Sequence, residues 1–334
     1  MADDVTLSLE DAFDLARSAL LRLGMAEQAA GALARATVDA EAVGKRPVGF
    51  AHLVDYLAAL AAGRIDGRAE PLFTAPVPAL MKCDAMGGVA QHGFEIVEDE
   101  LAEKARTFGL AIFALRNCYT TGELGWYAAR LAAQGLVALA ATNGPAVLAG
   151  AGGRKPVYCT NPLAFAAPLA DGREILIDQA SSATAFVNIR AAAERGSPIP
   201  EGWALDAAGE PTTNAEAALA GALLAFGGDR GANIALMVEV LAAGLTGANW
   251  STDAPSFRAG AASPGTGLFV LAIAPHLLAE DFPERLAAQA TRLSGEFGVH
   301  VPGLGRAEAR RRAEESGIVL PRPLFDSISS YRRS

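Results

Sequence analysis

Short apolar stretches of strand length alternate with helical segments through the middle of this chain, and helical segments occupy both ends. Strand-like stretches cover residues 110–115, 136–142, 163–167, 175–177 and 267–274. Helical apolar spacing is found in residues 12–23, 27–43, 52–62, 91–108, 123–133, 183–195 and 231–246, and the tail from residue 280 is mostly helical. Strands that alternate with helices are typical of α/β proteins. The pattern therefore predicts an α/β fold with helical material at both ends.

Local signals mark several boundaries of these segments. Ser8 and Asp11 form a capping-box pattern ahead of the first helix, and Gly109 is a stop signal after the helix that ends at residue 108. A proline-punctuated stretch at residues 70–80 and a turn-rich connector at residues 196–214 interrupt the alternation.

The composition fits an ordered, acidic globular protein. Of the 334 residues, 51% are hydrophobic and 19% are charged, and the formal net charge is −9. Acidic residues interrupt the basic segment at residues 306–312, so we expect that segment to be a solvated helix face. A nucleic-acid partner is not expected, because it would need a basic surface.

The cysteines, histidines and N-terminus argue against several other classes. Cys83, Cys118 and Cys159 are widely spaced and form no CxxC pair, so we expect no disulfide framework and no structural zinc. The four histidines are scattered and form no metal-binding pattern. We find neither a signal-like apolar core nor an uncharged stretch of membrane-spanning length. We therefore expect a cytoplasmic protein with no metal site and no membrane contact.

Residues 158–165, Tyr-Cys-Thr-Asn-Pro-Leu-Ala-Phe, place a polar turn between apolar stretches. A strand-like segment then ends at Asp178, which Gln179 and Ala180 follow. Ligands of open α/β sheets usually bind at the ends of strands. We therefore expect a site at this edge.

Two glycine-containing segments are candidates for anion binding. Residues 227–231, which include Asp229 and Arg230, precede a predicted helix, where free N–H groups and the helix dipole suit an anion. A tight structural turn explains the same glycines equally well. Residues 150–155 lack the GxGxxG spacing of a dinucleotide-binding loop after a strand, so an ordinary Rossmann domain is disfavoured.

Seven short motifs occur in one order along the chain. They are residues 117–125 (NCYTTGELG), 141–145 (ATNGP), 153–156 (GRKP), 160–168 (TNPLAFAAP), 178–182 (DQASS), 200–203 (PEGW) and 227–231 (GGDRG). Together they resemble the malate/L-lactate dehydrogenase family of NAD(P)-dependent oxidoreductases, which also contains reductases of Δ1-pyrroline-2-carboxylate and Δ1-piperideine-2-carboxylate. The resemblance spans residues 8–320.

The resemblance implies a non-Rossmann nucleotide-binding domain on a largely antiparallel sheet, a helical substrate lobe formed by both termini, and a homodimer. We expect an N-terminal substrate lobe at residues 1–115, a dinucleotide-binding domain at 116–275, and a C-terminal segment at 276–334 that returns to the lobe. NADPH or NADH is the implied cofactor. By position, the cofactor-binding residues would be Thr120, Thr121, Gly122, Glu123, Leu124, Asp178, Gln179, Ala180, Asp229 and Arg230.

The substrate side departs from the family pattern. The family usually has Gly-x-x-Ser-His-Gly, in which Ser and His form a proton relay with a distant Asp. Here Pro47, Val48 and Asn188 occupy the three relay positions, and Thr120 replaces a further His. Thr160 aligns with a residue that contacts the substrate carboxylate, and His52 falls where the family has a substrate-binding Arg.

The missing relay favours an imine substrate. Reduction of a 2-oxo acid makes an alkoxide, which needs a proton donor or equivalent stabilisation. A cyclic imine can bind already protonated, as an iminium, and hydride addition then neutralises it. We therefore expect reduction of Δ1-pyrroline-2-carboxylate or its six-membered homologue to L-proline or L-pipecolate, with Thr160 and His52 on the carboxylate and a hydroxyl of Tyr119 or Thr121 assisting proton transfer.

Two alternatives stay open from the sequence. In a 2-hydroxyacid dehydrogenase, His52 would replace the lost His as the acid. In a catalytically silent relative, the chain would bind a nucleotide or metabolite without turnover.

Overall fold

The computed structural model describes residues 4–333, and its largest sheet has seven strands. Their order across the sheet is β2 (Leu72–Val77), β3 (Leu80–Asp84), β4 (Leu110–Cys118), β13 (Thr266–Ile273), β5 (Val137–Thr142), β8 (Leu163–Pro168) and β9 (Glu174–Gln179). Neighbouring strands are antiparallel except β3 and β4, which are parallel. The predicted α/β class is therefore confirmed.

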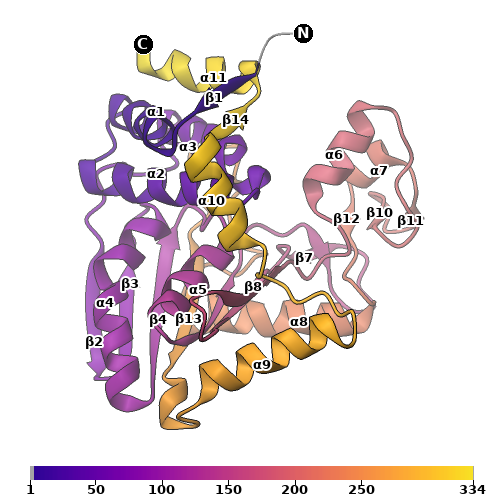
Figure 1. The fold of residues 1–334 in the computed structure, drawn as a ribbon. Helices are drawn as coiled ribbons and strands as arrows, with labels where there is room; N and C mark the ends of the chain where they lie inside the picture. The colour runs from indigo at the N-terminus through magenta and orange to yellow at the C-terminus, as the bar shows by residue number, and fades with distance from the viewer. Residues whose placement is uncertain (1–3, 334) are drawn as a thin grey trace.

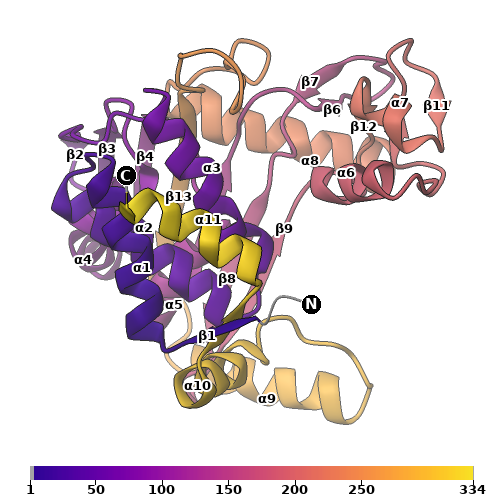
Figure 2. The ribbon, with the colours of Figure 1, turned by 90° about the horizontal axis from the view of Figure 1, so that it is seen from above.

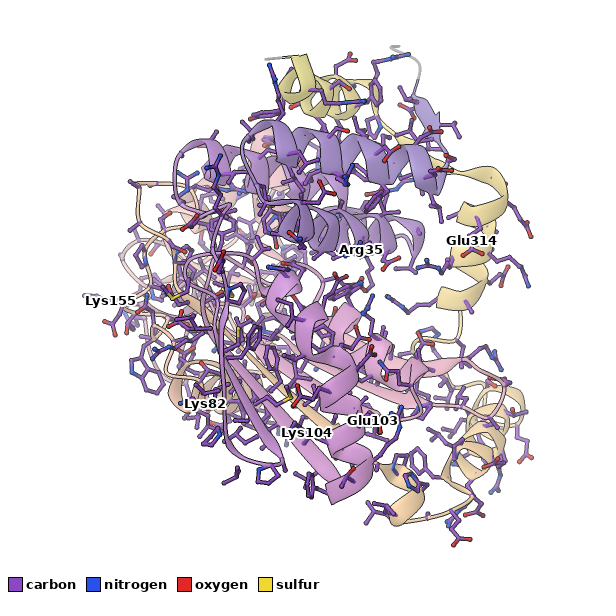
Figure 3. The ribbon with its side chains drawn as sticks, turned by 90° about the vertical axis from the view of Figure 1, so that its left-hand side faces the viewer. Arg35, Lys82, Glu103, Lys104, Lys155 and Glu314 are labelled. Atoms are coloured by element: carbon purple, nitrogen blue, oxygen red, sulfur yellow. The ribbon has the colours of Figure 1, made fainter. Side chains whose placement is uncertain are left out.

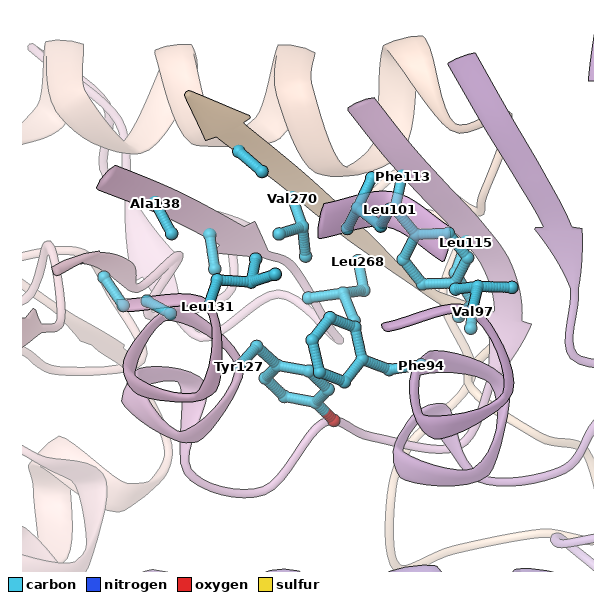
Figure 4. Close-up of a cluster of buried hydrophobic side chains, with 14 of the residues drawn as sticks. Phe94, Val97, Leu101, Phe113, Leu115, Tyr127, Leu131, Ala138, Leu268 and Val270 are labelled. Atoms are coloured by element: carbon cyan, nitrogen blue, oxygen red, sulfur yellow. The ribbon is translucent and has the colours of Figure 1, made fainter. Parts of the chain in front are cut away.

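Helices cover both faces of this sheet. α4 (Ala90–Phe108) and α5 (Leu124–Ala133) lie on one face, while α8 (Asp229–Glu239) and the π-helix η2 (Val240–Leu245) lie on the other. Alternate residues of β13 pack on opposite faces of the sheet. Leu268 and Val270 pack with Phe94 and Tyr127 under α4 and α5 (Figure 4). Phe269 packs on the other face with Val238 of α8. This alternation is the period of two that a strand imposes on its side chains.

The elements at the two ends of the chain pack together (Figures 1 and 2). The N-terminal elements are β1 (Val5–Leu7), α1 (Leu9–Arg22), α2 (Glu27–Ala42), the short helix η1 (Arg46–Val48) and α3 (Phe50–Ala61). The C-terminal elements are α10 (Arg306–Ser316), β14 (Ile318–Leu320) and α11 (Arg322–Arg333). β1 pairs with β14, and Ala313, Ile318 and Ile328 join the apolar cluster of α1, α2 and α3.

A smaller unit projects from the seven-stranded sheet (Figure 2). Its five strands are, in order, β11 (Pro211–Thr212), β10 (Ala204–Leu205), β12 (Ala222–Leu223), β6 (Leu148–Ala149) and β7 (Pro156–Tyr158). Its helices are α6 (Phe186–Glu194) and α7 (Ala215–Leu219). The short helix η3 (Pro275–Leu277) and α9 (Phe282–Gly295) follow β13, and Ala290 of α9 packs on Leu169 after β8.

Several predicted boundaries are confirmed. Ser8 caps α1 by accepting a hydrogen bond from the backbone of Asp11, and Gly109 ends α4 with a φ of 86°, a left-handed value that glycine adopts at little cost. The helix expected at residues 231–246 begins at Asp229 and turns into the π-helix η2 after Glu239.

Two local predictions, for residues 70–80 and 196–214, were wrong. The proline-punctuated stretch at residues 70–80 forms β2 and the start of β3, and the connector at 196–214 contains β10 and β11. All six residues of β2 are exposed at the sheet edge, so no buried face marks the strand, and an edge tolerates Pro76. The expected division after residue 115 falls within β4. The preceding elements β2, β3 and α4 belong to the same sheet unit as β4.

Charged side chains cover the outside of the sheet unit, as Figure 3 shows for Glu103 and Lys104 on α4 and for Lys82 on β3. Among residues 4–333, no helix combines the length and the apolar character that crossing a membrane requires.

Candidate active site

The turn after β7 is held by a buried carboxylate. Asn161 has a φ of 37°, and its side-chain nitrogen donates to Glu239 Oε2 at 2.7 Å and to the carbonyl of Ala235 at 2.8 Å. The backbone N–H of Ser251 donates to Glu239 Oε1 at 2.6 Å, and the Ser251 hydroxyl donates to Oε2 at 2.7 Å. Glu239 on α8 therefore fixes the turn that presents Thr160.

Glu239→Gln is expected to lower the free energy of unfolding by about 2 kcal/mol. The carboxylate accepts all three hydrogen bonds, and a Gln amide would turn an N–H towards one of the donors. Urea denaturation measures the difference. Glu100→Gln is the matched control: Glu100 is exposed and, among residues 4–333, forms an ion pair with Lys104 within α4, so its loss should cost under about 0.5 kcal/mol. Equal losses in the two variants would contradict the structural role of Glu239.

Thr160 opens onto a cavity of about 380 Å³ at the end of β5, β8 and β9. Most of the predicted site residues line it: Pro47, Val48, His52, Thr120, Thr121, Gly122, Glu123, Leu124, Thr160, Asp178, Gln179 and Ala180. Residues from three distant parts of the chain thus meet at one place. The lining also includes residues that the sequence did not single out as site residues: Lys45, Thr142, Asn143, Cys159, Pro162 and Phe257.

Four predicted residues lie outside this cavity. Tyr119 is buried behind its wall, and its hydroxyl donates to the carbonyl of Phe257 at 3.0 Å. Asn188 lies on α6, where its side chain donates to Thr184 Oγ1 at 3.1 Å. Asp229 lines a second cavity, and Arg230 is exposed beside it on the first turn of α8. The Tyr119 hydroxyl is therefore engaged within the protein, and the side chain of Asn188 contacts Thr184, just before the start of α6.

The second cavity measures about 340 Å³ and is lined largely by glycine. Its wall beside the start of α8 includes the backbone of Gly150, Gly152, Gly227 and Gly228. Because glycine has no side chain, the free N–H groups at this helix end are little obstructed. The same segment after β9 reaches both cavities, because Ala180 lines the first and Ala183 lines the second. An extended ligand that follows residues 178–183 would reach both.

Two carboxylates lie on the wall of the first cavity. Asp178 accepts a hydrogen bond from the backbone of Gly125 at 2.8 Å, and Glu123 precedes α5. Burial raises the pKa of Asp178, and the neighbouring charge of Glu123 raises it further against the hydrogen bond from Gly125. One oxygen of Glu123, Oε2, is buried without a hydrogen-bond partner among the described residues. A ligand donor in the cavity can satisfy that oxygen.

Arg306 compensates the charge of Glu123. Its Nη1 lies 2.6 Å from Glu123 Oε1, and its Nε lies 3.7 Å from Glu174 Oε1. The side chains of Arg306 and Glu123 are only 15% and 2% exposed. The expectation that residues 306–312 form a solvated face is therefore wrong for Arg306, although Arg311 and Arg312 are exposed. No local pattern reveals this contact, which joins residues 183 positions apart.

Comparisons with known proteins identify the family of this chain. Residues 7–329 match the family model described as malate/L-lactate dehydrogenase. The Delta(1)-pyrroline-2-carboxylate/Delta(1)-piperideine-2-carboxylate reductase of Pseudomonas aeruginosa is 38% identical over 97% of this chain and 98% of that protein. The (2R)-3-sulfolactate dehydrogenase (NADP(+)) of Chromohalobacter salexigens is 36% identical over 97% of each chain.

A solved structure matches the whole fold. The crystal structure of Δ1-piperideine-2-carboxylate reductase from Pseudomonas syringae pv. tomato superposes with a TM-score of 0.93 at 34% identity, covering 98% of this chain and 99% of that one. The chain therefore belongs to the malate/L-lactate dehydrogenase family of nicotinamide-dependent oxidoreductases.

Proposed function

We propose that this protein reduces a cyclic imine carboxylate, Δ1-pyrroline-2-carboxylate or Δ1-piperideine-2-carboxylate, to L-proline or L-pipecolate. The observation that carries the proposal is the chemistry of the relay positions. Pro47 and Val48 line the cavity where the family usually has Ser and His, and neither side chain can donate a proton. Reduction of an imine proceeds through an iminium and forms no alkoxide, so it needs no proton donor at these two positions. The names of the relatives from Pseudomonas species support the same substrate class.

The cavities fit a dinucleotide of the nicotinamide type. Two cavities lined by one segment of the chain suit its two halves, and the glycine-lined cavity at the start of α8 suits its phosphates. Glu123 has an unpaired buried oxygen for a ligand donor. We assign residues 120–124 and 178–180 to the nicotinamide half, and Asp229 and Arg230 to the other half. When bound, NADPH or NADH supplies the hydride.

The side chains of the cavity bind and orient the substrate. Thr160 and His52 are assigned to the substrate carboxylate, and Lys45 adds a positive charge at the rim. Phe257 and Val48 provide apolar surface for the ring methylenes. Thr121 offers a hydroxyl inside the cavity, whereas that of Tyr119 is already donated to Phe257.

The elements at the two ends of the chain are assigned to substrate binding, because η1 and α3 carry Pro47, Val48 and His52. The rest of the cavity wall belongs to the sheet unit, which we regard as a non-Rossmann nucleotide-binding domain with few parallel strand pairs. A homodimer is also proposed. Its support is the exposed apolar face that Leu236, Met237, Val240 and Leu245 form on α8 and η2.

A substrate panel tests the proposed function. Oxidation of NADPH and of NADH is followed by absorbance with both cyclic imines and with pyruvate and oxaloacetate. We expect kcat/KM for an imine to exceed that for either oxo acid by about 10²-fold or more, the lower end of what a positioned acid contributes. The coenzyme that supports the higher value identifies the preference.

Two outcomes would contradict the proposal. Faster turnover of an oxo acid would instead identify a 2-hydroxyacid dehydrogenase. Thermal stabilisation by NADPH without turnover of any compound would identify a silent relative.

A further inference from the structure

The imidazole of His52 is held firmly within α3. Its Nδ1 lies 3.0 Å from Oδ2 of Asp55, which is nearly one helical turn further along. The ring packs edge-on against Tyr56, with the centroids 4.8 Å apart. Tyr56 is itself buried, and its hydroxyl accepts a hydrogen bond from Gln91 at 3.1 Å. The orientation of His52 is therefore determined by two neighbours on its own helix.

Asp55 bridges His52 to the loop that closes the cavity. Its second oxygen, Oδ1, lies 3.5 Å from Nη2 of Arg258. Phe257, the preceding residue, lines the cavity. The two oxygens of Asp55 thus contact two different elements, and the side chain is 34% exposed.

Asp55 is the anionic partner in this cluster. Burial alone would raise the pKa of Asp55, but the hydrogen bond with His52 and the positive charges of His52, Arg258 and Arg190 hold it below its ordinary value. An ionised acceptor beside Nδ1 holds a proton on that nitrogen. Among the described residues, Nδ1 is the ring nitrogen with a hydrogen bond, which leaves Nε2 available to a ligand in the cavity.

We propose that His52 is the catalytic proton donor to the substrate nitrogen and that Asp55 is the positioning residue that holds its imidazole. This inference rests on the proposed function. The carboxylate and the nitrogen of a cyclic 2-carboxylate imine are both attached to C2, so a donor that reaches the carboxylate is also close to the nitrogen. The proton source has therefore moved from the relay positions at Pro47 and Val48 to α3.

The step balances as follows. A substrate that arrives as the neutral imine takes its proton from the imidazolium form of His52: the Nε2–H bond breaks, the proton forms a new bond to the imine nitrogen, and the ring keeps its Nδ1 proton. The iminium carbon then accepts the hydride, and the π electrons of the C=N bond become the nitrogen lone pair. Solvent returns a proton to Nε2, so the sum is imine, hydride and one proton giving the secondary amine.

Asp55→Asn and Asp55→Ala test the role of Asp55, with Asp171→Asn as the matched control. Asp171 pairs with Arg173 on an exposed turn, so its neutralisation should leave kinetics unchanged. We expect Asp55→Ala to lower kcat at neutral pH by about 10²-fold, with a smaller effect on KM. In Asp55→Asn we expect the pH profile of kcat to differ from that of the wild type, because Asn presents no anion to Nδ1 of His52.

A spectroscopic measurement separates positioning from a purely structural role. In the unliganded protein, the ¹⁵N shifts of His52, assigned with His52→Gln, should report the Nδ1–H tautomer in the wild type and a shift towards Nε2–H in Asp55→Ala. A pH profile of Asp55→Asn identical to that of the wild type would overturn the proposal. So would an Asp55→Ala variant with a lowered melting temperature but an unchanged kcat and tautomer.

The failure of the proposed function would be recognised separately. It would appear as a lack of imine turnover by the wild type, whereas the tautomer of His52 requires no substrate. If an oxo acid is the faster substrate, the same variants and profiles apply to it, and the role of Asp55 is still decided.

Discussion

Replacing Arg306 by alanine is expected to lower the free energy of unfolding by about 3–5 kcal/mol, the range for removing one partner of a buried ion pair. Glu123, whose side chain is only 2% exposed, would lose its partner cation, and Glu174 would lose the same cation. The other carboxylate oxygen of Glu123, Oε2, has no hydrogen-bond partner among the described residues. No existing contact of that oxygen can therefore compensate for the lost cation. Chemical denaturation of the apo protein measures the loss.

Two comparisons make this prediction specific. Arg173→Ala removes an arginine whose pair with Asp171 is exposed, and should cost about 1 kcal/mol or less. The double variant Glu123→Gln with Arg306→Met leaves no uncompensated charge and should recover most of the stability. A loss in Arg306→Ala that matches the loss in Arg173→Ala would show that the pair contributes no more than a surface contact.

The sequence predicts the parts of the fold that local signals determine. The helices with clear caps and apolar spacing, such as α1 and α4, end within a residue or two of the predicted positions. β2 is missed because its residues are all exposed, so burial leaves no alternation to detect. The two-residue strands of the projecting unit are too short to carry any period.

The candidate site shows the same limit at the level of side chains. Short motifs that resemble the family point to Thr160 and Asp178, which lie together because the start of β8 pairs with the end of β9. Arg306 and Phe257 were missed, because their contacts with Glu123 and Tyr119 join segments far apart in the chain. Asp55 carried a usable signal: a His and an Asp three residues apart in a predicted helix share one face.

The same distinction between local pattern and long-range contact applies to Gly267 in β13. A Cβ added there would lie 1.8 Å from the carbonyl oxygen of Ala242 in η2, so backbone would have to move. The backbone of Gly267 also accepts from Thr142 Oγ1 at 2.7 Å and donates to Asn143 Oδ1 at 3.0 Å, and both of these residues line the cavity. The strand, the π-helix and the cavity wall thus meet at one residue without a side chain.

Gly267→Ala is therefore expected to cost about 3 kcal/mol or more, at or above the upper end for overpacking a core, because the clash is with backbone and not with a flexible side chain. Gly295→Ala at the end of α9 is the control, since its Cβ would meet no atom within 4 Å, and it should be neutral or slightly stabilising. Urea denaturation compares the two variants. If Gly267→Ala stays within 1 kcal/mol of the wild type, then η2 can separate from β13 at little cost, and the close contact does not determine how the sheet and the cavity wall fit together.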